Sequence, residues 1–380
     1  MGCFDIRHHW LFPEKIRIFS VSIASWLYSG ADDRDKPDER HAVFAGQRSG
    51  ILYIADRRCI LDHYHWIGDL DSKKGEKKET GMNTDFIKGI IVPILTPVDD
   101  NENIHEEKLR QMVDHVIGGG VHGILAYGSN GEFYAVEEKE MERGLKIMVD
   151  QAAKRVPVYM GIGSVTTKQA VRLARMAKTI GADGVSVLQP MFIKPTEEEL
   201  FEHFAAVADA VPDMPALLYN NPARTGYPFS VCLAMKLCDE CENIVGIKDS
   251  SGDMTMTAEF IRQSQNRDFK VLGGKDTLIY GAMAYGAAGC VATTANMFPQ
   301  LVVSIYDKCM AGDFAGALKD QYLLTPIRLA MDKASFPVGT KDLANLMGLD
   351  VGAPYSPNKS SRGAVLENMR SAIRLAGYDI

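Results

Sequence analysis

The sequence lacks several features that would point to particular classes of protein. No apolar run approaches the roughly 18 residues of a membrane-spanning helix, and the formal net charge of −7 is not concentrated in any long run of like charge. We therefore expect neither nucleic acid nor a membrane as a partner. The seven cysteines are odd in number and scattered along the chain, unlike the disulfide framework of a small secreted domain. A reducing, cytoplasmic setting and a small-molecule substrate are expected.

From Phe86 onward the sequence repeats one pattern, in which a short apolar run is followed by a loop with Gly or Asn and then by an amphipathic helix. Short continuous apolar runs are typical of parallel strands that are covered on both faces. The helical segments have ordinary end signals, such as Thr166 before and Gly181 after the helix expected over 168–180. The repetition predicts a TIM (β/α)₈ barrel, with strands over 89–95, 123–126, 158–161, 184–187, 216–219, 245–248, 270–273 and 289–293.

Two parts of the chain lie outside this repeat. Residues 312–380 predict three more helices, which would form a C-terminal helical extension on a barrel over residues 82–311. Residues 1–81 do not share the pattern, although they contain all three tryptophans. They are either an appended segment or translated upstream sequence before a natural start at Met82. We favour the second hypothesis, because residues 77–79 (Lys-Lys-Glu) can be encoded by a purine-rich stretch that resembles a bacterial ribosome-binding site. In either case we expect this segment to be poorly packed, and an intact mass of the native protein distinguishes the two hypotheses.

A lysine ends the sixth predicted strand. Catalytic groups of TIM barrels lie at the carboxyl ends of the strands, and Lys248 occupies such a position after Gly246 and Ile247. An ammonium in an apolar barrel mouth loses hydration, which favours the free amine that attacks a ketone. The alternative is a lysine paired with a neighbouring acid such as Asp249. Strand position alone does not distinguish the two.

Two other strand ends carry polar groups that can serve the same cavity. Tyr219 closes the fifth strand, beside the sixth, and a phenol there can shuttle protons while a carbinolamine forms and loses water. After the second strand, Ser129 and Asn130 lie between Gly128 and Gly131, so that backbone N–H groups and small polar side chains can converge on a carboxylate. Each signal by itself is weak, because a tight turn and a strand-end aromatic explain them equally well.

Together these motifs resemble the dihydrodipicolinate synthase and N-acetylneuraminate lyase family, over a region from about Phe86 to the C-terminus. The sequence GSNGE matches the family's Ser/Thr-Thr-Gly-Glu loop, YNNP its Tyr-Asn-x-Pro element, and GIKDSS its Gly-x-Lys-x-(Ser/Thr)-Ser element. The resemblance implies that Lys248 forms an imine with pyruvate, that Tyr219 is the acid/base, and that Ser129 is the hydroxyl linked to it. Backbone N–H groups at Ser129 and Asn130 would bind the pyruvate carboxylate, with Gly131 in the same turn.

Three positions bear on the substrate. Phe192 stands where the family's synthases place a tyrosine that reaches across a subunit interface, and it has no hydroxyl for a proton relay. Asn130 stands where synthases and sialic acid lyases have Thr, and GSNGE is similar to the 4-hydroxy-2-oxoglutarate aldolase branch. Arg224 matches the arginine with which the synthases hold the carboxylate of aspartate semialdehyde, and a guanidinium can bind both carboxylate oxygens at once. A loop-stabilising arginine is the alternative.

We therefore predict a lyase or aldolase that acts on pyruvate or another 2-oxo acid through a lysine Schiff base, and the resemblance implies that it assembles as a homotetramer, a dimer of dimers. The alternatives are the 4-hydroxy-tetrahydrodipicolinate synthase reaction itself and a non-catalytic barrel that senses a 2-oxo acid. No metal or organic cofactor is implied; Cys238 and Cys241 form a CxxC pair, but no second pair stands at zinc spacing. Lys275 and Asp276, after the seventh strand, are plausible residues of the cavity rim, but they are assigned no role because a solvated loop pair explains them equally well.

Overall fold

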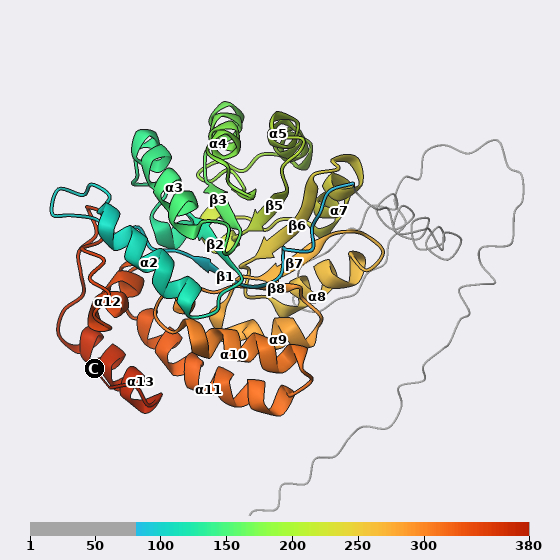
Figure 1. Ribbon diagram of the computed structural model, residues 1–380. Coiled ribbons are helices and arrows are strands. Elements are labelled where there is room, and N and C mark those ends of the chain that lie inside the picture. Colours follow the sequence, from blue (N-terminus) through green and yellow to red (C-terminus); the bar gives the residue numbers. More distant parts are fainter. Residues whose placement is uncertain (1–80, 380) are drawn as a thin grey trace, which may run out of the picture. The chain divides into compact units, whose positions relative to one another are not determined.

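The computed structural model describes residues 81–379, so the predicted N-terminal segment, apart from Gly81, lies outside the described residues. Eight parallel strands follow one another in chain order and close into a barrel, because β1 pairs with β8 as well as with β2 (Figure 1). The predicted fold, a TIM barrel with a C-terminal helical extension, is confirmed. The strands are β1 (Gly89–Pro93), β2 (Gly123–Ala126), β3 (Val158–Ile162), β4 (Gly184–Leu188), β5 (Ala216–Asn220), β6 (Ile244–Asp249), β7 (Lys270–Gly273) and β8 (Gly289–Val291).

The strands are buried on both faces, which explains their continuous apolar sequences. One set of side chains fills the barrel interior, including Leu125, Tyr159, Leu217 and Leu272. The opposite set packs against the surrounding helices. The interior is therefore a packed core, and only the layer at the carboxyl ends of the strands is free to form a site.

Helices follow the strands and cover the barrel. Their ends agree with the predicted signals: the Thr166 side chain accepts a hydrogen bond from the N–H of Gln169, and Gly181 has the left-handed φ of 94°. The covering helices are α2 (Glu106–Gly118), α3 (Glu138–Ala152), α4 (Thr167–Ile180), α5 (Glu197–Ala210), α7 (Val231–Glu240), α8 (Met254–Gln263), α9 (Ile279–Ala284) and α10 (Pro299–Met310), and the short α6 (Pro222–Thr225) lies in the loop after β5.

Short 3₁₀ turns follow three of the strands, namely η2 (Ser129–Gly131), η3 (Asp276–Leu278) and η4 (Thr293–Asn296). The expected extension of the last strand to residue 293 is wrong, because β8 ends at Val291. The carboxylate of Asp276 accepts hydrogen bonds from the N–H groups of Thr293 (3.1 Å) and Thr294 (2.6 Å). These bonds turn the chain into η4.

Three helices follow α10: α11 (Phe314–Met331), α12 (Val338–Leu346) and α13 (Ala364–Leu375). Helix α11 lies beside α10 and α13, in the orange to red part of the ribbon (Figure 1). Residues after α11 return to the barrel mouth, where Phe336 borders the same cavity as Lys248. Within residues 81–379, no helix is both long enough and apolar enough to cross a bilayer.

Candidate active site

The pairing of β5 with β6 places Tyr219 directly beside Lys248. Side chains alternate between the two faces of a strand, so these two point into the barrel mouth, one layer above Leu217 and Gly246. Glycine is required at position 246, because a Cβ there would lie 2.4 Å from the carbonyl oxygen of Lys270 on β7. The predicted proximity of the two strand ends follows directly from this register.

Lys248 is 4% exposed, and its Nζ lies 4.0 Å from the centroid of the Tyr219 ring. No hydrogen bond or ion pair joins this Nζ to another described residue. Asp249 points to the opposite face of β6, where its carboxylate accepts hydrogen bonds from Asn220 Nδ2 (2.8 Å) and Thr257 Oγ1 (2.5 Å). The alternative of a Lys248–Asp249 pair is therefore wrong, and the amine is available to a ligand.

The phenol of Tyr219 is buried among polar side chains. Asn221 Nδ2 donates a hydrogen bond of 2.8 Å to its oxygen, and Ser129 Oγ lies 3.5 Å away. Burial acts to raise the pKa of Tyr219, but the charge of Lys248 and hydrogen bonds from Ser129, Asn221 and Ser250 outweigh it, so this pKa is lowered. The 3.5 Å separation is long for a hydroxyl pair, and such contacts commonly shorten when substrate binds.

The turn after β2 is the 3₁₀ turn η2. Its first two backbone N–H groups, those of Ser129 and Asn130, have no acceptor within the turn, because the turn's own bonds begin at the N–H of Gly131. The side chain of Asn130 is tied on both sides, since Nδ2 donates to Thr293 Oγ1 (2.8 Å) and Oδ1 accepts from Thr340 Oγ1 (3.0 Å). The turn can therefore offer backbone donors in a fixed orientation.

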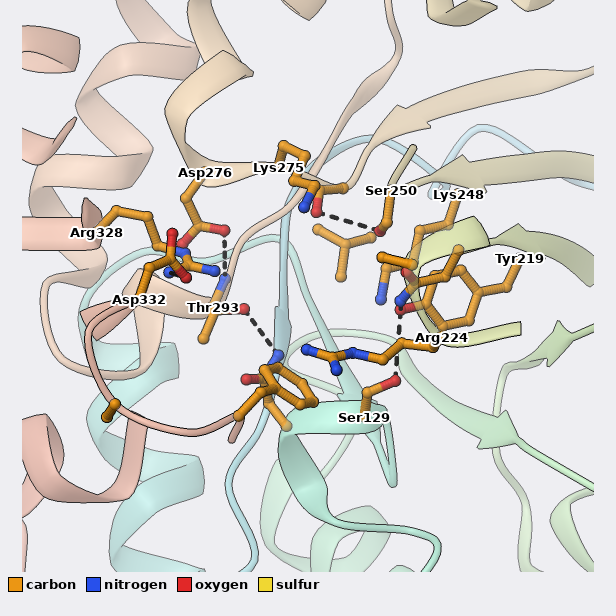
Figure 2. Close-up of a pocket in the computed structure, with 17 residues that line it drawn as sticks. Ser129, Tyr219, Arg224, Lys248, Ser250, Lys275, Asp276, Thr293, Arg328 and Asp332 are labelled. Atoms are coloured by element: carbon orange, nitrogen blue, oxygen red, sulfur yellow. Dashed lines mark hydrogen bonds and ion pairs between the residues drawn. The ribbon is translucent and has the colours of Figure 1, made fainter. Parts of the chain in front are cut away.

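These groups border a cavity of about 350 Å³ at the carboxyl end of the barrel. Figure 2 shows Ser129, Tyr219, Lys248 and Arg224 converging on it from four separate segments. Its lining carries more cationic than anionic side chains, which suits an anionic ligand. The charged lining residues are Arg224, Lys248, Lys275, Arg328, Asp276 and Asp332.

The two carboxylates in this lining are already engaged. Asp332, the residue directly after α11, is paired with Arg328 of that helix, so the C-terminal extension supplies part of the cavity wall. Asp276 is 3% exposed and bonded to the backbone of η4. The interpretation of Lys275 and Asp276 as a solvated loop pair is therefore wrong for Asp276, which is a buried structural acid.

Arg224 follows β5 in the last turn of α6 and borders the cavity. Its Cζ lies 4.0 Å from the centroid of the Phe336 ring. No hydrogen bond or ion pair joins its guanidinium to another described residue. The loop-stabilising alternative, in which it would bond nearby carbonyls, is therefore not what the structure shows.

Two predicted substrate-binding residues do not border the cavity. Gly131 is the last residue of the turn, and its carbonyl accepts a hydrogen bond from Thr96 Oγ1 (2.8 Å). Phe192 is 96% exposed on the loop after β4, with a left-handed φ of 75°. Neither residue is therefore part of the cavity lining within a single chain.

Other lining residues were not singled out from the sequence. Asn221, Ser250 and Thr293 follow strand ends, so the rule that identified Lys248 could also have identified them. Arg328, Asp332 and Phe336 carry no such signal, because they belong to the segment after the barrel repeat.

Comparison with known proteins agrees with this geometry. The sequence model of the Dihydrodipicolinate synthetase family matches residues 86–374. The chain belongs to this family. A 4-hydroxy-tetrahydrodipicolinate synthase of Methanopyrus kandleri is 36% identical over 292 residues, which cover 77% of this chain and 97% of that protein. The corresponding synthase of Thermus thermophilus is 36% identical over 264 residues, covering 70% of this chain and 88% of that protein.

Solved structures of family members have the same fold. A crystal structure of a dihydrodipicolinate synthase from Bacillus anthracis is 32% identical, with a TM-score of 0.73, and the match covers 76% of this chain and 97% of that one. The predicted family is confirmed, and membership in the Dihydrodipicolinate synthetase family makes the chain a lyase with a class I aldolase mechanism.

Proposed function

We propose that the chain forms an imine between Lys248 and pyruvate or a related 2-oxo acid, and then makes or breaks a carbon–carbon bond, or eliminates water or ammonia, next to it. The main support is the position of the Lys248 Nζ, 4.0 Å from the ring centroid of Tyr219 and free of any ion pair with described residues. A lysine without a carboxylate partner, beside a phenol in a cavity, has the neighbours that imine formation needs.

The proposed steps use only groups of the cavity. The phenolate of Tyr219 accepts a proton from the Lys248 ammonium, and the free amine attacks the ketone carbon. Tyr219 then relays a second proton from the nitrogen to the oxygen and gives up its own proton as the C–O bond breaks, so that the carbinolamine loses water and a protonated imine remains. The protonated imine takes up the electron pair of the C–H or C–C bond that breaks at the adjacent carbon, as an enamine forms, and where a C–H bond breaks the phenolate accepts the proton. Throughout, the N–H groups of Ser129 and Asn130 hold the 2-oxo acid carboxylate.

Borohydride reduction in the presence of pyruvate tests the imine. Reduction converts the imine into a stable secondary amine, so the protein is expected to gain the mass of the reduced pyruvate adduct, mapped to Lys248. An adduct at Lys275, or none, would contradict the proposal. Binding of pyruvate without an adduct would instead favour the non-catalytic sensing barrel.

The synthase reaction, in which pyruvate condenses with aspartate semialdehyde, is a second candidate. Arg224 favours it, because its guanidinium borders the cavity without an ion pair to any described residue and lies over the ring of Phe336. A planar fork in this position suits the carboxylate of a second substrate. Asn130 and Phe192 favour the aldolase branch, since both depart from the synthase pattern.

Substitution of Arg224 tests whether the second substrate is anionic. Arg224→Ala is expected to raise KM for a carboxylate-bearing aldehyde by about 10- to 100-fold, the size of one lost charge-assisted contact. The pyruvate concentration that gives half-maximal borohydride trapping should not change. Arg224→Lys keeps the charge without the fork, so it should recover only part of the loss. Equal KM values in all three proteins would show that Arg224 does not bind the second substrate.

We also propose that residues 82–311 and 312–380 act as one catalytic unit, since Arg328 and Phe336 complete the cavity that the barrel begins. A cytoplasmic homotetramer remains our proposal for the assembly. The exposed Phe192 supports an interface at the loop after β4, and sedimentation of wild type and Phe192→Asp would test it. A monomeric wild type, or a variant that assembles unchanged, would contradict it.

A further inference from the structure

The residue that ends the turn after β2 has a strained backbone and a buried charge. Glu132 has a left-handed φ of 55° and is 0% exposed. Non-glycine residues keep such a conformation only when the surrounding structure enforces it. Glu132 directly follows the turn that carries Ser129 and Asn130, so the contacts that hold Glu132 in this conformation also bear on that turn.

Within the described residues, the ion pair and the hydrogen bond of the Glu132 side chain both come from the C-terminal extension. Its Oε2 lies 2.7 Å from Nζ of Lys341, which is 1% exposed, and its Oε1 accepts a hydrogen bond from the N–H of Tyr355 (3.1 Å). Lys341 Nζ also donates to the carbonyl of Ala353 (2.9 Å). The ion pair therefore joins the end of the turn to α12 and to the segment after it.

A second link starts at the neighbouring residue of α12. Thr340 Oγ1 donates to Asn130 Oδ1 (3.0 Å), Asn130 Nδ2 donates to Thr293 Oγ1 (2.8 Å), and the N–H of Thr293 donates to Asp276 Oδ1 (3.1 Å). This chain of buried bonds runs from α12 across the turn after β2 to the loops after β8 and β7. Figure 2 shows its part between Thr293 and Asp276 at the cavity wall.

A buried ion pair is weak evidence for a gain in stability, because both charges lose their hydration. Fixed geometry is the better-supported use of such a pair, and here the pair is attached to the turn whose residues Ser129 and Asn130 line the cavity. We propose that Thr340 and Lys341 are positioning residues, which hold the Ser129–Asn130 turn in its carboxylate-binding conformation. The C-terminal extension thereby sets the affinity for the 2-oxo acid. This inference rests on the proposed function.

Thr340→Val tests the inference, since it keeps the size of the side chain and removes only the hydroxyl. The pyruvate concentration for half-maximal borohydride trapping at Lys248 is expected to rise about five- to tenfold, the size of one lost buried hydrogen bond. Thr340→Ser keeps the hydroxyl and should stay within about twofold of wild type on the same grounds.

A matched control separates positioning from stability. Thr84 is also buried, and its hydroxyl donates to Asp268 (2.8 Å) at the amino end of the barrel, away from the cavity. Thr84→Val should lower Tm by an amount similar to Thr340→Val and leave half-saturation unchanged. An unchanged half-saturation in Thr340→Val, or an equal rise in Thr340→Ser or Thr84→Val, would overturn the inference.

The ion pair gives a second test that does not depend on Thr340. Glu132→Gln combined with Lys341→Met removes both charges, so that neither is left buried and unpaired. The folded double variant is expected to show the same rise in half-saturation, and wild-type affinity in it would overturn the role of Lys341. A wild-type protein that forms no adduct would overturn the proposed function itself, whereas an adduct with unchanged affinity in both variants overturns only this inference.

Discussion

Replacement of Lys248 by alanine is expected to lower kcat/KM by at least ~10⁴-fold, the order of loss seen when a covalent nucleophile is removed. No other lysine among residues 81–379 occupies the same place. Lys248 is held inside the barrel mouth by its register with Tyr219, whereas Lys275 belongs to the loop after β7. The borohydride-trapped pyruvate adduct should disappear together with the activity, and mass spectrometry after reduction measures it directly.

Lys275→Ala is the matched control for this experiment. It removes a second lysine of the same cavity and should leave the adduct at Lys248 in place. Because Lys248 is buried, both variants need a thermal unfolding curve that shows a folded protein. If Lys248→Ala stays active and still forms the borohydride-trapped adduct, or if Lys275→Ala no longer forms it, the imine forms on a residue other than Lys248.

The barrel fold and the Tyr219–Lys248 pair at its mouth could be predicted, because both depend on local sequence patterns. Apolar runs separated by amphipathic helices predict parallel strands, and the closed order of those strands places the ends of β5 and β6 side by side. The proximity of Tyr219 and Lys248 can then be predicted without any information on the rest of the chain. The same local signals gave the ends of α4 at Thr166 and Gly181.

The remainder of the site depends on contacts between segments far apart in sequence. Glu132 and Lys341 form a buried pair although 209 positions separate them, and Arg328 and Phe336 reach the cavity from the segment after the barrel repeat. Asp276 looked like a solvated loop residue because the two N–H groups that it binds belong to another loop. Such contacts produce no periodic pattern in the sequence, so they could not be predicted from it.

Tyr219→Phe is expected to reduce the rate of imine formation by about 10²- to 10³-fold, the contribution of a positioned acid/base. The substitution removes one oxygen atom and leaves the ring beside Lys248. It also leaves the amide of Asn221 without its acceptor. Stopped-flow measurement of imine formation gives the rate, and the final extent of borohydride trapping shows whether the lysine still reacts. Ser129→Ala, which removes only the more distant hydroxyl at 3.5 Å, should cost less.

The pH dependence separates an acid/base from a residue that merely packs against Lys248. Burial opposes ionisation of Tyr219, yet the charge of Lys248 and the hydrogen bonds from Ser129, Asn221 and Ser250 prevail, so its pKa lies below the ordinary value of 10.0. The phenolate accepts the proton of the amine, so its contribution grows as pH rises towards this pKa. The ratio of the wild-type rate to the Tyr219→Phe rate should therefore increase with pH, with a midpoint below pH 10. A ratio that is constant over this range would show that Tyr219 acts by packing alone, and the proton would have to leave through another group of the cavity.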